Sequence, residues 1–139
     1  MRAALLIDDM DAVRETLAAI LEALGYTVTA TSSGTDGVRR AEGGGFDIVV
    51  TDIIMPDCDG NEVMRAVASM TDRPAILAVS GGGWVVEVDN ALSFARCYAD
   101  AVVQKPVTRD ELARALDDAF SRPGTSNQAS AQSAGTPAT

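Results

Sequence analysis

The amino-acid sequence predicts an α/β domain, a doubly wound parallel sheet of five strands covered on both faces by five helices. Short apolar runs alternate along the chain with segments of helical periodicity, which is typical of repeated β-α units. The apolar runs are continuous rather than alternating, as strands buried on both faces require. The chain has 139 residues, of which 47% are hydrophobic, enough for one core and too few for two ordinary domains.

Five runs have the length and composition of buried strands. They are AALLI (3–7), YTVTAT (26–31), FDIVVT (46–51), PAILAV (74–79) and AVVQ (101–104). None of them approaches the length of a membrane-spanning segment. The N-terminus MRAALLIDD has no secretory signal pattern, so we expect a cytoplasmic protein without membrane contact.

The first helix follows the first strand. Val13, Leu17, Leu21 and Leu24 recur at the spacing of one helix face, and Gly25 is a typical end for such a helix. Weaker helical patterns cover about 34–42 and about 86–98, which predicts the second and the fourth helix.

Two further helices have clear start signals. Asp59 followed by Glu62 predicts a capping box at the start of a helix over about 60–70. Thr108 with Glu111 predicts the same device for the last helix, with Val107 and Leu112 placed as a hydrophobic staple.

The end of the chain differs in composition from the rest. From Ser121 onward the sequence is SRPGTSNQASAQSAGTPAT, almost uncharged and rich in Ser, Ala, Gly and Thr. Such a composition cannot bury enough apolar surface to fold. We therefore expect one domain over residues 1–120 and a disordered tail over residues 121–139.

Composition excludes several classes of function. The chain has no histidine, so Ser-His-Asp and Cys-His nucleophile systems and His-ligated zinc are impossible. The net charge of −9 without a basic block argues against nucleic-acid binding. Cys58 and Cys97 are two isolated cysteines, as expected for reduced thiols in a cytosolic protein.

Polar residues stand at the ends of four predicted strands. Asp8 and Asp9 follow the first strand, Asp52 the third, Ser80 with three glycines the fourth, and Lys105-Pro106 the fifth. The carboxyl ends of parallel strands meet at one edge of the sheet, where ligands bind. We therefore expect three carboxylates, one hydroxyl and one ammonium group to lie close together.

Such an arrangement requires a cation, unless some of the acids stay protonated. Two carboxylates about 4 Å apart repel by roughly 4 kcal/mol at an effective dielectric constant near 20. Oxygen ligands without His or Cys suit a hard divalent ion that keeps several waters, Mg²⁺ or also Mn²⁺. With Lys105 nearby, the set is suited to holding a metal and an anion together, and phosphate is the obvious anion.

These residues, in this order, resemble a known family. Asp8-Asp9, the segment TDIIMPDCDG (51–60), Ser80-Gly81 and Lys105-Pro106 are similar to the response regulator receiver domain, the phosphoacceptor part of bacterial two-component systems. The resemblance covers residues 1–120. It implies a flavodoxin-like, chemotaxis-regulator-like fold with strand order 2-1-3-4-5, which is a common order of doubly wound sheets.

The resemblance implies a role for each residue at this edge. Asp52 accepts the phosphoryl group, forming an aspartyl phosphate. Asp9 binds Mg²⁺ directly, Asp8 acts mainly through a bound water, and the backbone carbonyl of Ile54 completes the protein ligands. The donor is the phosphohistidine of a partner histidine kinase or histidine phosphotransfer protein.

Two more residues act on the phosphoryl group itself. Lys105 pairs with Asp52 before phosphorylation and with phosphoryl oxygens afterwards, and Ser80 donates a hydrogen bond to a phosphoryl oxygen. The Lys105–Pro106 bond is expected to be cis. Such a protein is not an enzyme toward other molecules, because it catalyses only its own phosphorylation and dephosphorylation.

The chain departs from the family at one position of the conformational switch. Many receivers carry an aromatic residue three positions before the lysine, and here that residue is Val102. Tyr98 lies nearby but before the strand, as expected for a partly buried ring. Trp84 is either a hydrophobic lid on the fourth helix or an exposed partner contact.

The output of the domain is expected to be a contact with another protein. The family's usual contact face joins the fourth helix, the fifth strand and the fifth helix, and a homodimer through this face is possible. About nineteen residues follow the last helix, too few for a DNA-binding fold. The chain is therefore expected to be a stand-alone receiver, or else a receiver excised from a longer protein.

Two rival functions remain as alternatives. A pseudo-receiver would be an interaction module that never takes phosphate. An aspartate-nucleophile phosphatase of the haloacid dehalogenase type needs an acid two residues after the nucleophile, where this chain has Ile54. The sequence leaves open the cognate kinase, the target, the oligomeric state and the lifetime of the phosphorylated form.

Overall fold

Five parallel strands form one sheet in the order β2-β1-β3-β4-β5, as predicted. The computed structural model describes residues 1–55, 59–81 and 98–121. The strands are β1 (Ala3–Ile7), β2 (Thr27–Thr31), β3 (Ile48–Asp52), β4 (Ala75–Ser80) and β5 (Ala101–Gln104). The α/β fold class and the strand order are therefore confirmed.

Four helices lie in the described part of the chain. They are α1 (Asp11–Ala23), α2 (Gly34–Glu42), α3 (Gly60–Ala68) and α5 (Arg109–Ser121). The helix predicted at about 86–98 lies outside the described residues. So do Trp84, Cys58, Cys97 and the predicted tail, except that its first residue, Ser121, is the last residue of α5.

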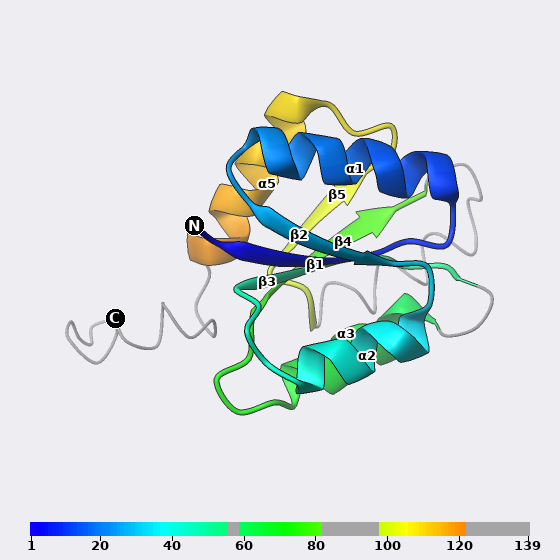
Figure 1. Ribbon diagram of the computed structural model, residues 1–139, viewed down its shortest axis with the longest axis vertical. Coiled ribbons are helices and arrows are strands. Elements are labelled where there is room, and N and C mark those ends of the chain that lie inside the picture. Colours follow the sequence, from blue (N-terminus) through cyan, green and yellow to red (C-terminus); the bar gives the residue numbers. More distant parts are fainter. Residues whose placement is uncertain (56–58, 82–97, 122–139) are drawn as a thin grey trace.

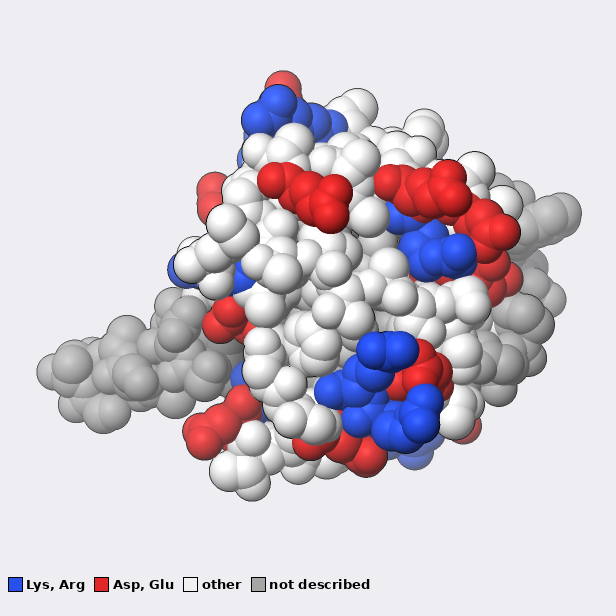
Figure 2. Space-filling model, in the orientation of Figure 1, with Lys and Arg blue, Asp and Glu red and all other residues white. Residues whose placement is uncertain are grey.

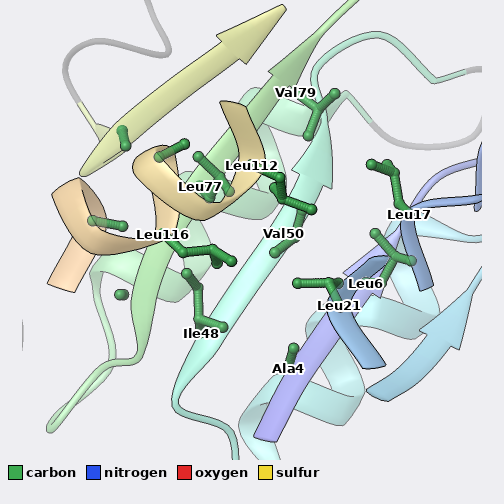
Figure 3. Packing of buried hydrophobic residues seen from close by; sticks show 14 residues of the cluster. Ala4, Leu6, Leu17, Leu21, Ile48, Val50, Leu77, Val79, Leu112 and Leu116 are labelled. Carbon is green, nitrogen blue, oxygen red and sulfur yellow. The ribbon is translucent and has the colours of Figure 1, made fainter. Parts of the chain in front are cut away.

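The helices cover the two faces of the sheet in pairs, α1 with α5 and α2 with α3 (Figure 1). Neighbouring residues of a strand enter different cores: Leu6 packs under α1 and α5, whereas Leu5 packs under α2 and α3. Figure 3 shows the first of these cores, in which Leu77 and Leu116 also lie. Burial on both faces is the reason why the strands read as continuous apolar runs.

The edge strand β2 differs from the central strands. None of its residues is fully buried, whereas every residue of β3 and β4 is. Its pattern of threonines and small apolar residues fits a half-exposed edge. None of the helices in the described segments is long and apolar enough to cross a bilayer.

The predicted helix signals are confirmed where the structure describes them. Gly25 follows α1 with a φ of 99°, a left-handed conformation that favours glycine. Asp59 and Glu62 form the capping box of α3. Thr108 Oγ1 accepts a hydrogen bond from the Glu111 amide at 3.1 Å, and the Glu111 carboxylate accepts one from the Thr108 amide at 3.0 Å.

Several boundaries differ from the prediction. β2 and β4 start one residue later, and β3 two residues later, than the predicted runs. β3 and β4 each extend one residue further, so Asp52 and Ser80 are the last residues of their strands rather than the first residues beyond. The helix predicted to reach residue 70 ends at Ala68. Asp52 and Ser80 are therefore held by the hydrogen-bonded sheet itself, which is more rigid than a loop.

Candidate functional site

Three carboxylates meet at the carboxyl edge of the sheet, as predicted. Asp8 and Asp9 follow β1 and Asp52 ends β3, and one carboxylate oxygen from each lies within 4.8 Å of the others. Asp8 is fully buried, Asp52 is 5% exposed and Asp9 is half-buried. The pairing of Leu6 with Val50 and of Ile7 with Thr51 places the ends of these two central strands side by side.

Lys105 lies against this cluster. Its Nζ is 3.3 Å from Asp52 Oδ2 and 3.2 Å from Asp8 Oδ2. The pair with Asp52 was predicted, and the pair with Asp8 was not. The Lys105 amide donates to the Ser80 carbonyl at 2.8 Å, and the Lys105–Pro106 bond is cis, as predicted.

Ser80 and Ile54 occupy the flanks of the cluster. Ser80 ends β4 and is 3% exposed, one residue beyond the Val79 that pairs with Asp52. Ile54 lies two residues past Asp52, and its side chain is 48% exposed. The predicted roles of the Ser80 hydroxyl and the Ile54 carbonyl remain predictions.

The environment of Asp52 changes its acidity. Burial raises the pKa of its carboxyl group to about 6, partly countered by Lys105 and reinforced by the neighbouring Asp8. One carboxylate oxygen, Oδ1, accepts a hydrogen bond from the Ile53 amide at 2.9 Å. The other faces Lys105, so the charged form of Asp52 depends on cations at this edge.

Asp8 is anchored through its backbone and one of its two carboxylate oxygens. Its amide donates to the Thr31 carbonyl at 3.1 Å, and its Oδ1 accepts from the Met10 amide at 2.9 Å. Its Oδ2 is buried without a hydrogen bond from any described residue, although Lys105 Nζ is close. A buried carboxylate oxygen in this condition is a favourable ligand for a cation.

The donor set fits a hard divalent metal ion. The cluster offers carboxylate oxygens alone, without nitrogen or sulfur, and Asp9 is only half-buried. Such a set suits Mg²⁺, which keeps several of its waters, and Mn²⁺ would accept the same ligands. The residues present therefore fit the metal that the sequence predicts.

Gly60 holds the chain after Asp52 against the sheet. Its amide donates to the Ile53 carbonyl at 2.7 Å. A Cβ atom at this position would lie 2.1 Å from the Asp52 carbonyl oxygen and 2.6 Å from Ile53 Cα. Only glycine allows α3 to start this close to the end of β3.

A hollow of about 370 Å³ lies beside Lys105. Its walls are mostly apolar and come from the first turns of α1 and the segment that follows β5. The lining residues are Ala12, Val13, Thr16, Leu17, Gly81, Lys105, Pro106 and Val107. The sequence did not reveal this hollow, because its two walls are about ninety residues apart in the chain.

The contact of Arg14 with the backbone of Asp8 was not predicted. Arg14 Nη1 donates to the Asp8 carbonyl at 2.9 Å, and its Nη2 lies 2.6 Å from Asp11 Oδ1. In the sequence, Arg14 and Asp11 resemble an ordinary pair three residues apart on a helix surface. No local signal separates such a pair from one that reaches a functional residue.

Val102, which stands where many receivers have the switch aromatic, packs against a core of the sheet. Val102 is partly buried against the core under α2 and α3, and Tyr98 packs against the same core. The expectation of a partly buried Tyr98 ring is confirmed. Tyr98 also faces the first turns of α3, where it lines a smaller hollow with Asp59 and Arg65.

Comparisons with known proteins agree with this geometry. The profile of the response regulator receiver domain matches residues 4–117. The cell cycle response regulator CtrA of Brucella ovis and that of Brucella anthropi are each 30% identical over 108 residues. The match covers 78% of this chain and 45% of each relative, so the chain spans less than half the length of these relatives.

Solved structures show the same fold. A response regulator receiver domain protein from Clostridium thermocellum is 30% identical with a TM-score of 0.76, covering 86% of this chain and 94% of that chain. The receiver domain of a sensor histidine kinase from Pseudomonas aeruginosa PAO1 has magnesium coordinated in its active-site cleft. It is 28% identical with a TM-score of 0.75, covering 85% and 96% of the two chains. With its sheet order, its acidic cluster and the profile match over most of its length, this chain belongs to the response regulator receiver domain family of two-component systems.

Proposed function

We propose that the chain is a phosphoacceptor in a two-component phosphorelay, in which Asp52 takes a phosphoryl group in the presence of Mg²⁺. The observation that carries the proposal is the convergence of Asp8, Asp9 and Asp52 within 4.8 Å, with Lys105 Nζ 3.3 Å from Asp52. The magnesium in the related Pseudomonas aeruginosa receiver supports the choice of metal.

Asp52 is the proposed nucleophile. A carboxylate oxygen of Asp52 forms a bond to phosphorus while the phosphorus–nitrogen bond of the donor phosphohistidine breaks, and the electron pair of that bond returns to the imidazole nitrogen. The chain has no histidine, so the donor belongs to a partner, a histidine kinase or a histidine phosphotransfer protein. The product is an aspartyl phosphate.

The other residues orient and neutralise charge. Phosphoryl transfer depends on in-line positioning and on stabilising negative charge more than on covalent chemistry. Asp8, Asp9 and the Ile54 carbonyl would hold Mg²⁺, which supplies positive charge to the phosphoryl oxygens. Lys105 would add a second positive charge, 3.3 Å from Asp52. The hydroxyl of Ser80, which is buried at the end of β4, would donate to a phosphoryl oxygen.

The apolar hollow beside Lys105 supports contact with the donor protein. It lies between α1 and the Pro106–Val107 segment, next to the acidic cluster, and presents apolar surface where the partner must approach. Burial of such surface favours association without changing the chemistry at Asp52.

Phosphorylation would act by shifting the balance between two conformations, and the output would be a contact with another protein. With Val102 in place of an aromatic residue, the shift would rest on Ser80 and Lys105. We propose that this receiver makes no contact with nucleic acid and that a homodimer, where it forms, uses the face that includes β5 and α5. The receiver would act on no substrate other than its own phosphate.

The central test is labelling followed by mass spectrometry of the intact protein and its peptides. With Mg²⁺ and a small acyl phosphate or a phosphohistidine donor, the wild-type chain should gain one phosphoryl group on Asp52. Asp52→Asn should gain none, and Asp47→Asn, at the opposite edge of the sheet, should be labelled normally. Labelling that persists in Asp52→Asn would place the acceptor elsewhere.

A second test separates the partner contact from the chemistry. Thr16 is exposed on the rim of the hollow, so Thr16→Glu should slow transfer from the phosphohistidine partner by about tenfold or more. Labelling by a small acyl phosphate should stay unchanged, because that donor needs no docking surface. Equal effects on both donors would contradict the docking role of the hollow.

A third test addresses Lys105. Lys105→Ala should still bind metal but should no longer switch its partner contacts upon phosphorylation. Activation of the partner at the wild-type level would show that the assigned role of Lys105 is wrong.

The same experiments distinguish the rival functions. A wild-type chain that is never labelled, yet binds its target, would support the pseudo-receiver alternative. Turnover of small phosphate esters would support a phosphatase.

A further inference from the structure

We infer that Arg14 is a positioning residue for the metal site, holding the turn that carries Asp8 and Asp9 in the conformation that binds the ion. The inference rests on the proposed function, since it assumes that these two carboxylates are metal ligands. Arg14 itself touches neither the metal ligand oxygens nor the reacting group, so its effect passes through the backbone of Asp8.

The geometry of the turn carries the inference. Arg14 Nη1 donates to the Asp8 carbonyl oxygen at 2.9 Å. That carbonyl belongs to the planar peptide unit that joins Asp8 to Asp9, so holding the oxygen fixes the peptide plane from which the Asp9 side chain departs. Asp9 is only half-buried, so packing alone holds its side chain weakly, and the fixed peptide plane orients it further.

Two further hydrogen bonds hold the turn. Asp8 is tied to β2 by its amide, and the Asp8 carboxylate accepts from the Met10 amide at 2.9 Å. Met10 is the N-cap residue of α1, and its side chain makes no capping hydrogen bond. As a donor, the Arg14 side chain cannot cap the free amides of the first turn, but its bond to the Asp8 carbonyl ties the loop to that turn.

Arg14 is itself held in place. Its second guanidinium nitrogen lies 2.6 Å from Asp11 Oδ1, and its side chain is 19% exposed. It is the one basic residue of α1, among the acidic Asp11, Glu15 and Glu22. A fixed, planar guanidinium with two donors in use orients the loop more firmly than a flexible ammonium group.

The helix α2 supplies a natural control. Arg40 Nε lies 2.7 Å from Asp36 Oδ2, also within one helix, but its side chain is 48% exposed. Basic side chains on this face gather over α2, where Arg39 and Arg40 lie (Figure 2). Arg40 has the chemistry of Arg14 without a hydrogen bond to a residue of the acidic cluster.

The test is Mg²⁺ binding by titration calorimetry on the full chain, together with the Mg²⁺ dependence of labelling by a small acyl phosphate. Removal of a residue that orients a metal ligand typically costs 10–100-fold in metal affinity. We expect Arg14→Ala to weaken Mg²⁺ binding by about tenfold or more and Arg40→Ala to leave it unchanged. At saturating Mg²⁺, Arg14→Ala should be labelled at the wild-type rate, since the residue acts only through the metal ligands.

A conservative variant keeps the test decisive if Arg14→Ala fails to fold. Arg14→Lys retains one donor for the Asp8 carbonyl but cannot bridge to Asp11 in the same geometry, so its Mg²⁺ affinity should lie between those of the wild type and Arg14→Ala. Wild-type affinity in every folded Arg14 variant would overturn the inference and leave the proposed function intact. If the wild-type chain itself binds no Mg²⁺, the proposed function fails first.

Discussion

Asp52 combines a buried position with a proposed function that requires charge. Its pKa rises to about 6 from an ordinary value of 3.8, first because of burial, with Lys105 opposing the rise and Asp8 adding to it. A buried carboxylate is costly unless a positive charge lies beside it, and cations at this site lower that cost. Lys105 meets part of that need, and a bound metal would meet the rest.

This shift predicts how stability depends on pH. Between pH 4 and 6 the unfolded chain loses the Asp52 proton while the folded chain keeps it, so the free energy of unfolding falls as pH rises through this window. Two pKa units correspond to about 3 kcal/mol. In EDTA, the free energy of unfolding of Asp52→Asn, relative to that of the wild type, should therefore rise by about 2–3 kcal/mol as the pH rises from 4 to 7.

Urea denaturation of both proteins at several pH values measures this difference. Carboxylates outside the acidic cluster contribute equally in the two proteins, so their contributions cancel. A stability difference that stays constant from pH 4 to 7 would show that the pKa of Asp52 is not raised. Saturating Mg²⁺ should stabilise the wild type and reduce the gap.

Arg73 and Asp100 form a buried ion pair that has no part in the proposed chemistry. Two hydrogen bonds of 2.9 and 3.0 Å join the guanidinium to the carboxylate, and Asp100 Oδ2 also accepts from the Ile76 amide at 2.8 Å. The pair links the start of β4 to the start of β5, away from the acidic cluster.

Breaking this pair leaves a buried charge without compensation. Asp100→Ala should cost about 3–5 kcal/mol in the free energy of unfolding. The double variant Arg73→Leu with Asp100→Asn should cost less, because Asn still accepts from the Ile76 amide and no charge remains unpaired. Chemical denaturation of both variants tests this, and a double variant at least as unstable as Asp100→Ala would contradict it.

At the scale of the element, the start of α3 packs directly against the end of β3 because Gly60 has no side chain. A Cβ on Gly60 would overlap the Asp52 carbonyl oxygen at 2.1 Å, and the backbone there cannot move without moving Asp52. Gly60→Ala should therefore destabilise the protein by at least about 2 kcal/mol. It should also weaken Mg²⁺ binding, since the segment with Asp52 and Ile54 shifts.

The matched control is Gly43→Ala at the end of α2. A Cβ at Gly43 would lie 3.3 Å from the Arg40 carbonyl oxygen and 4.0 Å from that of Arg39, and Gly43 already has a right-handed helical conformation. Its effect on stability should stay below about 1 kcal/mol. Equal costs for the two substitutions would show that the close approach at Gly60 is unimportant.

The elements themselves were largely predictable from the sequence. Strand runs such as 3–7 and 101–104 match β1 and β5, and the capping signals at Asp59 and Thr108 mark the observed helix starts. These signals are local: a capping box or a continuous apolar run needs no knowledge of the rest of the chain. The ends of β3 and β4 were placed one residue short, because Asp52 and Ser80 look like turn residues but pair within the sheet.

At the scale of the whole molecule, metal binding should couple to folding. The three carboxylates come together only in the folded chain, so Mg²⁺ should bind the native state and stabilise it. At about 100 times the dissociation constant, the gain should be about 2.7 kcal/mol. Thermal unfolding with and without Mg²⁺ measures this gain.

Two variants make that experiment specific. Asp9→Asn should lose most of the Mg²⁺-dependent stabilisation, and Asp47→Asn should keep it, because Asp47 lies at the opposite edge and accepts from the Ala3 amide. A stabilisation that survives in Asp9→Asn would place the metal elsewhere on the acidic surface.

The sequence by itself determined the fold class, the strand order through the family resemblance, and the identity of the residues at the carboxyl edge. The sequence determined these features because local patterns show where each strand ends, and parallel strands bring their carboxyl ends to the same edge of the sheet. The tertiary structure alone decided that Lys105 contacts Asp8 as well as Asp52, that Arg14 holds the Asp8 carbonyl, and that an apolar hollow adjoins the site. Those contacts depend on side-chain directions and on the packing of α1 and the β5–α5 segment over the sheet, which no single stretch of sequence encodes.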